Sequence, residues 1–323
     1  MPQTYSPLAS PSATRATLEE FGLYTKHRLG QNFLVNDAVI GKIVELAELT
    51  QADRVLEVGP GIGTLTVALL ARAGHVVAVE ADRTLQEVLA ATTERDSEKF
   101  TLLMGDALKV VPSGLPSYVP GAGEEPPAAS QPGSDEDPQP AAAPQPGAGL
   151  NKFVSNLPYQ VAATLILQAL DTLPHLQREV VMVQREVADR IAAAPGSKAY
   201  GAYTAKLALR AQVTGRFEVG PGNFMPPPHV DSAVVRLDRI VPADPATGAP
   251  LTPAQAAAAD AVIEAAFAQR RKTIRNSMSA SGYDKAALDA AFAACGIAPS
   301  SRAETLSPQD FVRLALALGT PEA

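Results

Sequence analysis

A regular alternation of apolar runs and helical patterns constrains the fold of this chain more than any other feature. Apolar residues recur at helical spacing over Asp37–Ala47, and the next run, Arg54–Val58, is short, apolar and followed by glycines. The same order continues with helices predicted over residues 64–72 and 84–91 and strands over residues 75–79 and 100–104. Strands that alternate with helices at this spacing are typical of right-handed βαβ units. We therefore predict an α/β fold built on a parallel sheet.

Residues 112–149 interrupt this alternation. They contain 10 Pro, 7 Ala and 6 Gly among 38 residues, together with five acidic residues and no Lys or Arg. So few apolar side chains cannot offset the entropy of ordering, so we predict a disordered acidic insertion in a surface loop. This segment supplies −5 of the net charge of −7. The acidic total therefore does not exclude a nucleic-acid partner, because a partner responds to the distribution of charge.

The alternation resumes after the insertion and ends in a helical region. We predict strands over residues 152–155, 179–184 and 231–237, and helices over residues 161–170 and 199–213. Three further helical patterns cover residues 254–268, 283–293 and 308–318. The predicted division is a flexible tail over 1–20, an α/β domain over 21–240, a Pro-rich linker over 241–253 and a small all-helical domain over 254–323.

Composition indicates where such a chain acts. No apolar stretch approaches the roughly 20 residues of a membrane-spanning helix, and the Pro, Ser and Thr near the N-terminus do not resemble a signal peptide. We therefore expect a soluble cytoplasmic protein. One cysteine, Cys295, can form neither an internal disulfide nor a zinc cluster, so we expect no metal. A monomer is expected because no long exposed apolar stripe is evident.

A glycine-rich loop, residues 57–63 (EVGPGIG), stands between a predicted strand and a helix. Gly59 and Gly61 let the backbone turn sharply and approach a ligand closely. A nicotinamide fingerprint would need a third glycine at Thr64, whereas the acidic residue and the spacing here resemble the first motif of S-adenosylmethionine-dependent methyltransferases. In that class Glu80, at the next strand end, would bind the ribose hydroxyls, and Asp106 would bind the adenine amino group. The alternative is a tight turn followed by a helix-capping carboxylate.

The tetrapeptide Asn156-Leu157-Pro158-Tyr159 follows another predicted strand. The exocyclic amine of adenine is a poor nucleophile, so an enzyme must hold it and aim it at a methyl group. The side-chain oxygen of Asn156 and the carbonyl before Pro158 can accept its two N–H groups, and Tyr159 can stack on the base. Such a base must first leave its stack. Asn-x-Pro sequences also form ordinary turns, which is the alternative.

A proline-rich loop over residues 223–232 contains Phe224. Consecutive prolines form a stiff extended segment that can fix an aromatic ring in place. We expect Phe224 to cover the base on the face opposite Tyr159. The alternative is that Phe224 fills the core.

Together these motifs resemble the small-subunit type of the ribosomal RNA adenine N6,N6-dimethyltransferase family. The matching strings are GQNFL (30–34), the glycine loop, the Asn156 tetrapeptide, SKAYG (197–201), residues 224–237 and FAQRRKTIRNS (267–277). The resemblance implies a Rossmann-like class I methyltransferase sheet. It also implies transfer of two methyl groups from S-adenosylmethionine to each of two adjacent adenosines, in a hairpin loop near the 3′ end of 16S ribosomal RNA. The substrate in that family is an immature small ribosomal subunit, so a role in subunit biogenesis is implied as well.

The resemblance also assigns individual residues. The cofactor would contact Asn32, Leu34, Gly59, Gly61, Glu80, Asp106 and Asn156, and the target amine would be placed by Asn156, Leu157, Pro158, Tyr159 and Phe224. The RNA backbone would meet the basic segment formed by Arg270, Arg271, Lys272 and Arg275, for which a solvated helix face is the alternative.

Two departures from the family and three other functions stay open. Gln160 stands where members more often have Asn or His, and the acidic insertion lies between the Asp106 and Asn156 strand ends, so we expect it near the active-site edge. There it would either repel RNA weakly or be a neutral expansion. The other functions are a large-subunit adenine methyltransferase, an RNA-binding assembly factor with secondary catalysis, and a small-molecule methyltransferase, which the basic helical region disfavours.

Overall fold

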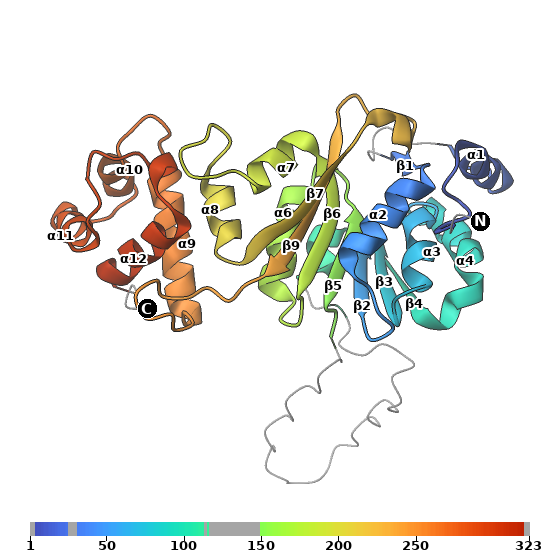
Figure 1. Cartoon of the computed structure of the whole chain (residues 1–323), viewed down its shortest axis with the longest axis horizontal. Coiled ribbons are helices and arrows are strands. Elements are labelled where there is room, and N and C mark those ends of the chain that lie inside the picture. The colour runs from blue at the N-terminus through green and yellow to red at the C-terminus, as the bar shows by residue number, and fades with distance from the viewer. Residues whose placement is uncertain (1–3, 25–30, 113–114, 116–148, 320–323) are drawn as a thin grey trace, which may run out of the picture. The chain divides into compact units, whose positions relative to one another are not determined.

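The computed structural model describes residues 4–24, 31–112, 115 and 149–319 (Figure 1). Almost all of the predicted acidic insertion therefore lies outside the described residues. Two compact units divide the chain. The first contains residues up to Val183 together with Phe217–Arg236, and the second contains Gln184–Arg216 and the residues from Leu237 onward.

A seven-stranded sheet runs through the described residues in the order β4-β3-β2-β5-β6-β9-β7. The pairs β4–β3, β3–β2, β2–β5 and β5–β6 are parallel, which confirms the predicted α/β class. From β2 the chain builds outward to β3 and β4, and then returns to the other side of β2 as β5. In open α/β sheets this reversal of order marks the ligand-binding crevice. The bounds are β2 Arg54–Val58, β3 His75–Glu80, β4 Phe100–Met104, β5 Lys152–Asn156, β6 Arg178–Gln184, β7 Ala211–Val219 and β9 Ser232–Arg239.

The sheet is buried on both faces within the first unit. Neighbouring residues of one strand point to opposite faces, and both Val76 and Val77 have no solvent exposure. Ile40 and Ile43 of α2 and Leu69 of α3 pack with the side chains of one face. Apolar burial of this kind is the main favourable term in folding. The helices of this unit are α1 Pro11–Glu20, α2 Asp37–Ala47, α3 Thr64–Leu70, α4 Gln86–Thr92, α5 Ala107–Val110 and α6 Ala162–Thr172.

Ser155 joins β2 and β5 where their ladder ends. The register of the two strands runs to Leu56 opposite Phe153. Beyond that point the Ser155 hydroxyl accepts the N–H of Val58 at 3.0 Å and donates to its carbonyl at 2.5 Å. A side chain thus satisfies backbone groups that a ladder would otherwise pair, and the two strand ends are fixed beside the crevice.

The second unit is largely helical. Its core contains Val262 and Ile263 of α9, Phe292 of α11 and Phe311 of α12. Strands β7 and β9 pass between the two units along the chain, so the division falls inside strands and not at the predicted linker over 241–253. The helices are α7 Arg185–Ile191, α8 Ala202–Ala208, α9 Pro253–Phe267, α10 Ile274–Ala280, α11 Lys285–Cys295 and α12 Pro308–Leu318.

The N-terminal segment differs from the predicted flexible tail. Residues 11–20 form α1, with Pro11 in its first turn and the Ser10 side chain accepting the N–H of Ala13. Upstream, the N–H groups of Tyr5 and Ser6 donate to the Asp37 carboxylate at the start of α2. The prediction was wrong because it weighed the Ser and Pro content and overlooked a helix start signal.

The predicted helix over residues 199–213 is also wrong in its second half. Helix α8 ends at Ala208, and β7 begins at Ala211. Burial alternates along β7 from Ala211 to Val219, as expected of a strand with one covered face. No helix within the described ranges is long and apolar enough to span a membrane.

Candidate functional site

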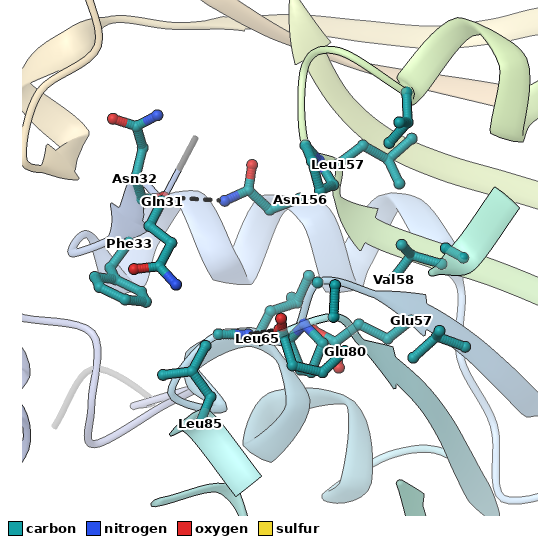
Figure 2. Close-up of a pocket in the computed structure, with 18 of the residues that line it drawn as sticks. Gln31, Asn32, Phe33, Glu57, Val58, Leu65, Glu80, Leu85, Asn156 and Leu157 are labelled. Atoms are coloured by element: carbon teal, nitrogen blue, oxygen red, sulfur yellow. Dashed lines mark hydrogen bonds between the residues drawn. The ribbon is translucent and has the colours of Figure 1, made fainter. Parts of the chain in front are cut away.

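A cavity of about 270 Å³ lies at the carboxyl ends of β2, β3, β4 and β5 (Figure 2). Gly59, Glu80, Asp106 and Asn156, each predicted at a different strand end, all line it. The predicted Asn32, Leu34, Gly61, Leu157, Pro158 and Tyr159 line it too, and so do Gln31, Phe33, Glu57, Ala81, Leu85 and Gln160. One enclosure therefore contains both the predicted cofactor residues and the tetrapeptide predicted to hold a base.

The glycine loop forms one wall of the cavity. Gly59 and Gly61 have φ of +72° and +63°, a region that side chains rarely enter. A Cβ atom on Gly59 would lie 3.4 Å from the Pro158 ring, and one on Gly61 would lie 3.0 Å from the Phe33 ring. Glycine is therefore needed here for its conformation, and also because the loop lies close against its neighbours.

Glu80 stands at the end of β3 with 7% of its surface exposed. One carboxylate oxygen accepts the N–H of Asp82 at 2.8 Å, and the other accepts the N–H of Gly61 at 3.3 Å. Burial raises the pKa of this carboxyl, and these backbone donors oppose the rise. Each oxygen keeps a second lone pair, so the fixed carboxylate can accept hydroxyl groups from a ligand.

Glu57 is a site residue that the sequence analysis did not assign. It lines the cavity with 1% exposure, and its Oε2 atom has no hydrogen-bond partner among the described residues. Burial, reinforced by the nearby Glu80 carboxylate, raises the pKa of Glu57 to about 8. A buried acceptor without a partner suits a ligand that brings a donor or a positive charge. The signal was present, since Glu57 is the acidic residue of the glycine-loop motif.

Asn156 ends β5, and its side-chain amide is oriented by the opposite wall. Nδ2 donates to the backbone carbonyl of Asn32 at 3.3 Å, shown dashed in Figure 2. The Asn156 side-chain oxygen is thereby left as the acceptor of the pair. The N–H of Leu157 donates to the Met182 carbonyl at 3.1 Å, which anchors the tetrapeptide to β6.

The wall that carries Asn32 is a two-residue strand. β1 (Phe33–Leu34) pairs antiparallel with β8 (Phe224–Met225), with Leu34 opposite Phe224. The N–H of Val35 continues this contact by donating to the Asn223 carbonyl at 2.8 Å. Residues distant in sequence thus hold Asn32 and Leu34 at the cavity.

Phe224 does not take the place predicted for it. Its side chain is 4% exposed, packs in the core cluster with Ile40 and Val219, and is absent from the lining of the cavity. The alternative assignment, a core residue, describes its surroundings. A strand pair turns its side chains into the core at this position, which the proline content of the loop did not indicate.

Tyr159, Gln160 and Asp106 stand at the cavity with different degrees of freedom. The Tyr159 hydroxyl lies 2.7 Å from the Ser232 hydroxyl, and burial raises the pKa of the phenol. Gln160 is exposed and lines the cavity. Asp106 caps α5 by accepting the N–H of Leu108 at 3.1 Å, so its other carboxylate oxygen remains available for a ligand.

The basic segment lies in the second unit and is not uniform. Arg270, Arg271 and Lys272 are exposed in the turn between α9 and α10. Arg275, in α10, instead forms a bidentate ion pair with Asp289, with both N–O distances at 2.6 Å, and this pairing raises the pKa of the guanidinium. Arg275 therefore has a counter-charge, contrary to the expectation of four unpaired cations.

The chain returns from the acidic insertion at the edge of the sheet opposite the cavity. Asn151 exchanges hydrogen bonds with the backbone of Arg54 at 2.8 and 3.0 Å, and its side chain donates to Asp53 at 2.8 Å. These residues stand at the amino ends of β2 and β5. The expectation that the whole insertion flanks the active-site edge therefore fails for its returning end. Its remaining residues lie outside the described part of the chain.

Comparison with known proteins identifies relatives over nearly the whole chain. The family model described as ribosomal RNA adenine dimethylase matches residues 22–319. The chain is 38% identical over 314 residues to ribosomal RNA small subunit methyltransferase A of Thermobifida fusca (strain YX), with 95% of each chain covered. It is 39% identical over 318 residues to the protein of the same name from Rhodococcus erythropolis (strain PR4 / NBRC 100887), with 97% of this chain and 95% of that one covered.

Solved structures show a similar fold. A dimethyladenosine transferase from Plasmodium falciparum superposes with a TM-score of 0.65 at 22% identity, covering 87% of this chain and 95% of the other. The 23S rRNA methyltransferase ErmE superposes with a TM-score of 0.60 at 23% identity, covering 89% and 99%. At these identities the likeness shows the fold alone.

Proposed function

The chain belongs to the ribosomal RNA adenine dimethylase family, and from this premise we propose that it methylates adenosine in the RNA of the small ribosomal subunit. The reaction would transfer methyl groups from S-adenosylmethionine to the N6 amines of two adjacent adenosines in the 3′-terminal hairpin loop of 16S ribosomal RNA. The observation that carries this proposal is the oriented side-chain oxygen of Asn156, facing the same cavity as the glycine loop and Glu80.

The cavity suits S-adenosylmethionine on chemical grounds. The unpartnered Oε2 atom of buried Glu57 can accept from the ammonium group of a methionine moiety. Glu80 can accept from ribose hydroxyls, and the available oxygen of Asp106 can accept from the adenine amino group. The loop containing Gly59 and Gly61 leaves room where any Cβ would meet Pro158 or Phe33. When bound, this cofactor supplies an electrophilic methyl group on a positively charged sulfur.

The chain's own residues would then position the amine. The Asn156 side-chain oxygen and the Leu157 carbonyl would accept its two N–H groups, which directs the nitrogen lone pair away from the adenine ring. Two fixed acceptors also favour the positive charge that develops on the nitrogen during transfer. Tyr159 would stack on the extruded base. No general base of high pKa is needed, because the amine loses its proton only after it has become cationic.

The RNA would be held by the exposed cations of the second unit. Arg270, Arg271 and Lys272 can neutralise backbone phosphates and release counterions. Arg275, already paired with Asp289, would contribute less. A substrate of this kind places the protein in the cytoplasm, and we propose that it acts there as a monomer on an immature subunit.

The substrate assignment is tested with methyl-labelled S-adenosylmethionine and three kinds of particle: unmethylated small subunits, fully methylated small subunits and large subunits. We expect label in the RNA of unmethylated small subunits alone. Label in large-subunit RNA would contradict the assignment in favour of the large-subunit activity. Tight binding of small subunits without label would favour an assembly factor.

A further inference from the structure

Tyr159 is held at both ends of its ring. At its backbone, Leu157 is anchored to Met182 of β6, and Pro158 packs against Gly59. At its far end, the phenol oxygen lies 2.7 Å from Ser232 Oγ. The ring is half-buried and lines the cavity. A tyrosine fixed only at its backbone could change its χ1 rotamer, and the second attachment restricts this movement.

Ser232 is placed where a hydroxyl needs a reason. It is the first residue of β9 and has no solvent exposure. Its hydrogen-bond partner among the described residues is the Tyr159 phenol. In the sheet, β6 lies between β5 and β9, so this bond links the end of one strand to the start of another that is not its neighbour. A buried hydroxyl without its partner costs about 1 to 3 kcal/mol, so the pair favours a single arrangement.

The aromatic surface of the cavity makes this arrangement matter. Among the described lining residues, the aromatic side chains are Phe33 and Tyr159. Phe33 is 6% exposed and lies against Gly61 of the cofactor loop, while Phe224 belongs to the core. Tyr159 is therefore the ring of the Asn156 tetrapeptide on which a target base can stack. Its orientation would decide where the base, and with it the amine, comes to rest.

We propose that Ser232 is a positioning residue for methyl transfer, which holds the Tyr159 ring in the orientation that receives the target adenine. This inference rests on the proposed function, in which Tyr159 stacks on the base. Ser232 touches neither the base nor the cofactor and acts only through Tyr159. A merely structural serine would affect the stability of the fold and leave the transfer step unchanged.

The test compares Ser232→Ala, Tyr159→Phe and the double variant in full-length protein, using single-turnover methylation of unmethylated small subunits at saturating cofactor. Each single variant is expected to lower the transfer rate constant about tenfold, with the dissociation constant of S-adenosylmethionine changed less than twofold. The double variant should lose no more than either single variant, because both remove the same hydrogen bond. Ser232→Thr, which keeps the hydroxyl, should recover most of the rate.

Thr101→Val is the matched control. It removes a hydroxyl bonded to His75 at 3.0 Å, and Thr101 lies near the amino ends of β3 and β4, away from the cavity. It should change stability and leave the transfer rate at the wild-type value. A wild-type rate in Tyr159→Phe would overturn the proposal, and this variant keeps the test decisive if Ser232→Ala folds poorly. Losses that multiply in the double variant would also overturn it.

A second measurement does not depend on activity. In protein labelled with 3-fluorotyrosine, the fluorine resonance of Tyr159 is identified by its absence in Tyr159→Phe. Without RNA or cofactor, we expect Ser232→Ala to shift and broaden that resonance, and an unchanged resonance would overturn the tether. If wild-type protein methylates no RNA, the proposed function fails, while this resonance still reports whether Ser232 holds the ring.

Discussion

The side-chain amide of Asn156 donates to the backbone carbonyl of Asn32 at 3.3 Å, so a two-residue strand determines which atom Asn156 offers to the cavity. With Nδ2 engaged, the side-chain oxygen is left as an acceptor. The arrangement accounts for an asparagine at this strand end, because an aspartate could not donate to Asn32.

Replacement of Asn156 should therefore damage the transfer step. Asn156→Ala is expected to lower the single-turnover rate constant about 10²- to 10³-fold, the range typical for loss of one preorganised polar contact to a transition state. Asn156→Asp should also be strongly impaired, because its carboxylate would face the Asn32 carbonyl without a proton between them. Circular dichroism checks that both variants fold. Near-normal turnover in Asn156→Asp would contradict the orienting role of Asn32.

Glu80 should control cofactor affinity. Hydrogen bonds to a charged group contribute about 1.5 to 3 kcal/mol, so Glu80→Ala is expected to weaken binding of S-adenosylmethionine by about tenfold to a hundredfold. Isothermal titration calorimetry measures this directly. The matched control is Glu87→Gln, which neutralises an exposed carboxylate on α4 and should leave the affinity unchanged. Equal affinities for Glu80→Ala and wild type would refute the assigned role.

The exposed and the paired cations of the basic segment should behave differently. Replacing Arg270, Arg271 and Lys272 together with Ser should reduce the slope of log affinity against log salt by about 2, since each phosphate contact to single-stranded RNA contributes about 0.7. Arg275→Ser should change the slope by less than one such contact, because its charge is already paired with Asp289. Lys285→Ser, an exposed cation in α11, is the control. A wild-type slope in the triple variant would favour a merely solvated surface.

Glu57 should make the ligand-free protein less stable as pH rises. Its folded pKa is about 8 against an ordinary value of 4.5, so between these values the folded state binds one more proton than the unfolded chain. The free energy of unfolding should therefore fall from about pH 5 to pH 8 and then level off. Glu57→Gln should remove this part of the decline, measured by urea denaturation at several pH values. An identical pH profile in the variant would mean that Glu57 is ionised throughout.

His75 should produce the opposite dependence at lower pH. Burial, assisted by Arg54, lowers its pKa from 6.5 to about 4, so the unfolded chain binds the extra proton in this range. Stability should be lost as pH falls from 6.5 toward 4. His75→Gln should flatten that part of the profile in the same denaturation experiment, and an undiminished acid loss would assign it to other groups.

The strands that could be predicted are those bounded by strong local signals. β2 and β4 begin and end at the predicted residues because each is a buried apolar run between polar or glycine residues. β7 was hidden behind α8, since Ala, Leu and Lys favour helix locally while pairing within the sheet decides the outcome. Its alternating burial at Val213 and Phe217 was a usable signal. α1 was missed although Ser10 and Pro11 form a recognisable helix start.

The site was predictable where a motif states its own geometry and not where distant segments meet. The glycine loop and the Asn156 tetrapeptide each carry their function at adjacent positions, so their meeting in one cavity followed from the sheet. The pairing of β1 with β8 joins residues about 190 positions apart and turns Phe224 into the core. The contact between Tyr159 and Ser232 likewise depends on tertiary structure alone.

The central claim is tested most directly by the chemical nature of the product. Purified protein is incubated with S-adenosylmethionine and unmethylated small subunits, the RNA is digested, and the modified nucleosides are identified by mass spectrometry, with Asn156→Ala in parallel. The account predicts N6,N6-dimethyladenosine at two adjacent positions of the 3′-terminal hairpin with wild-type protein, and almost none with the variant. Methylation at another base or another atom, or equal product from Asn156→Ala, would contradict it.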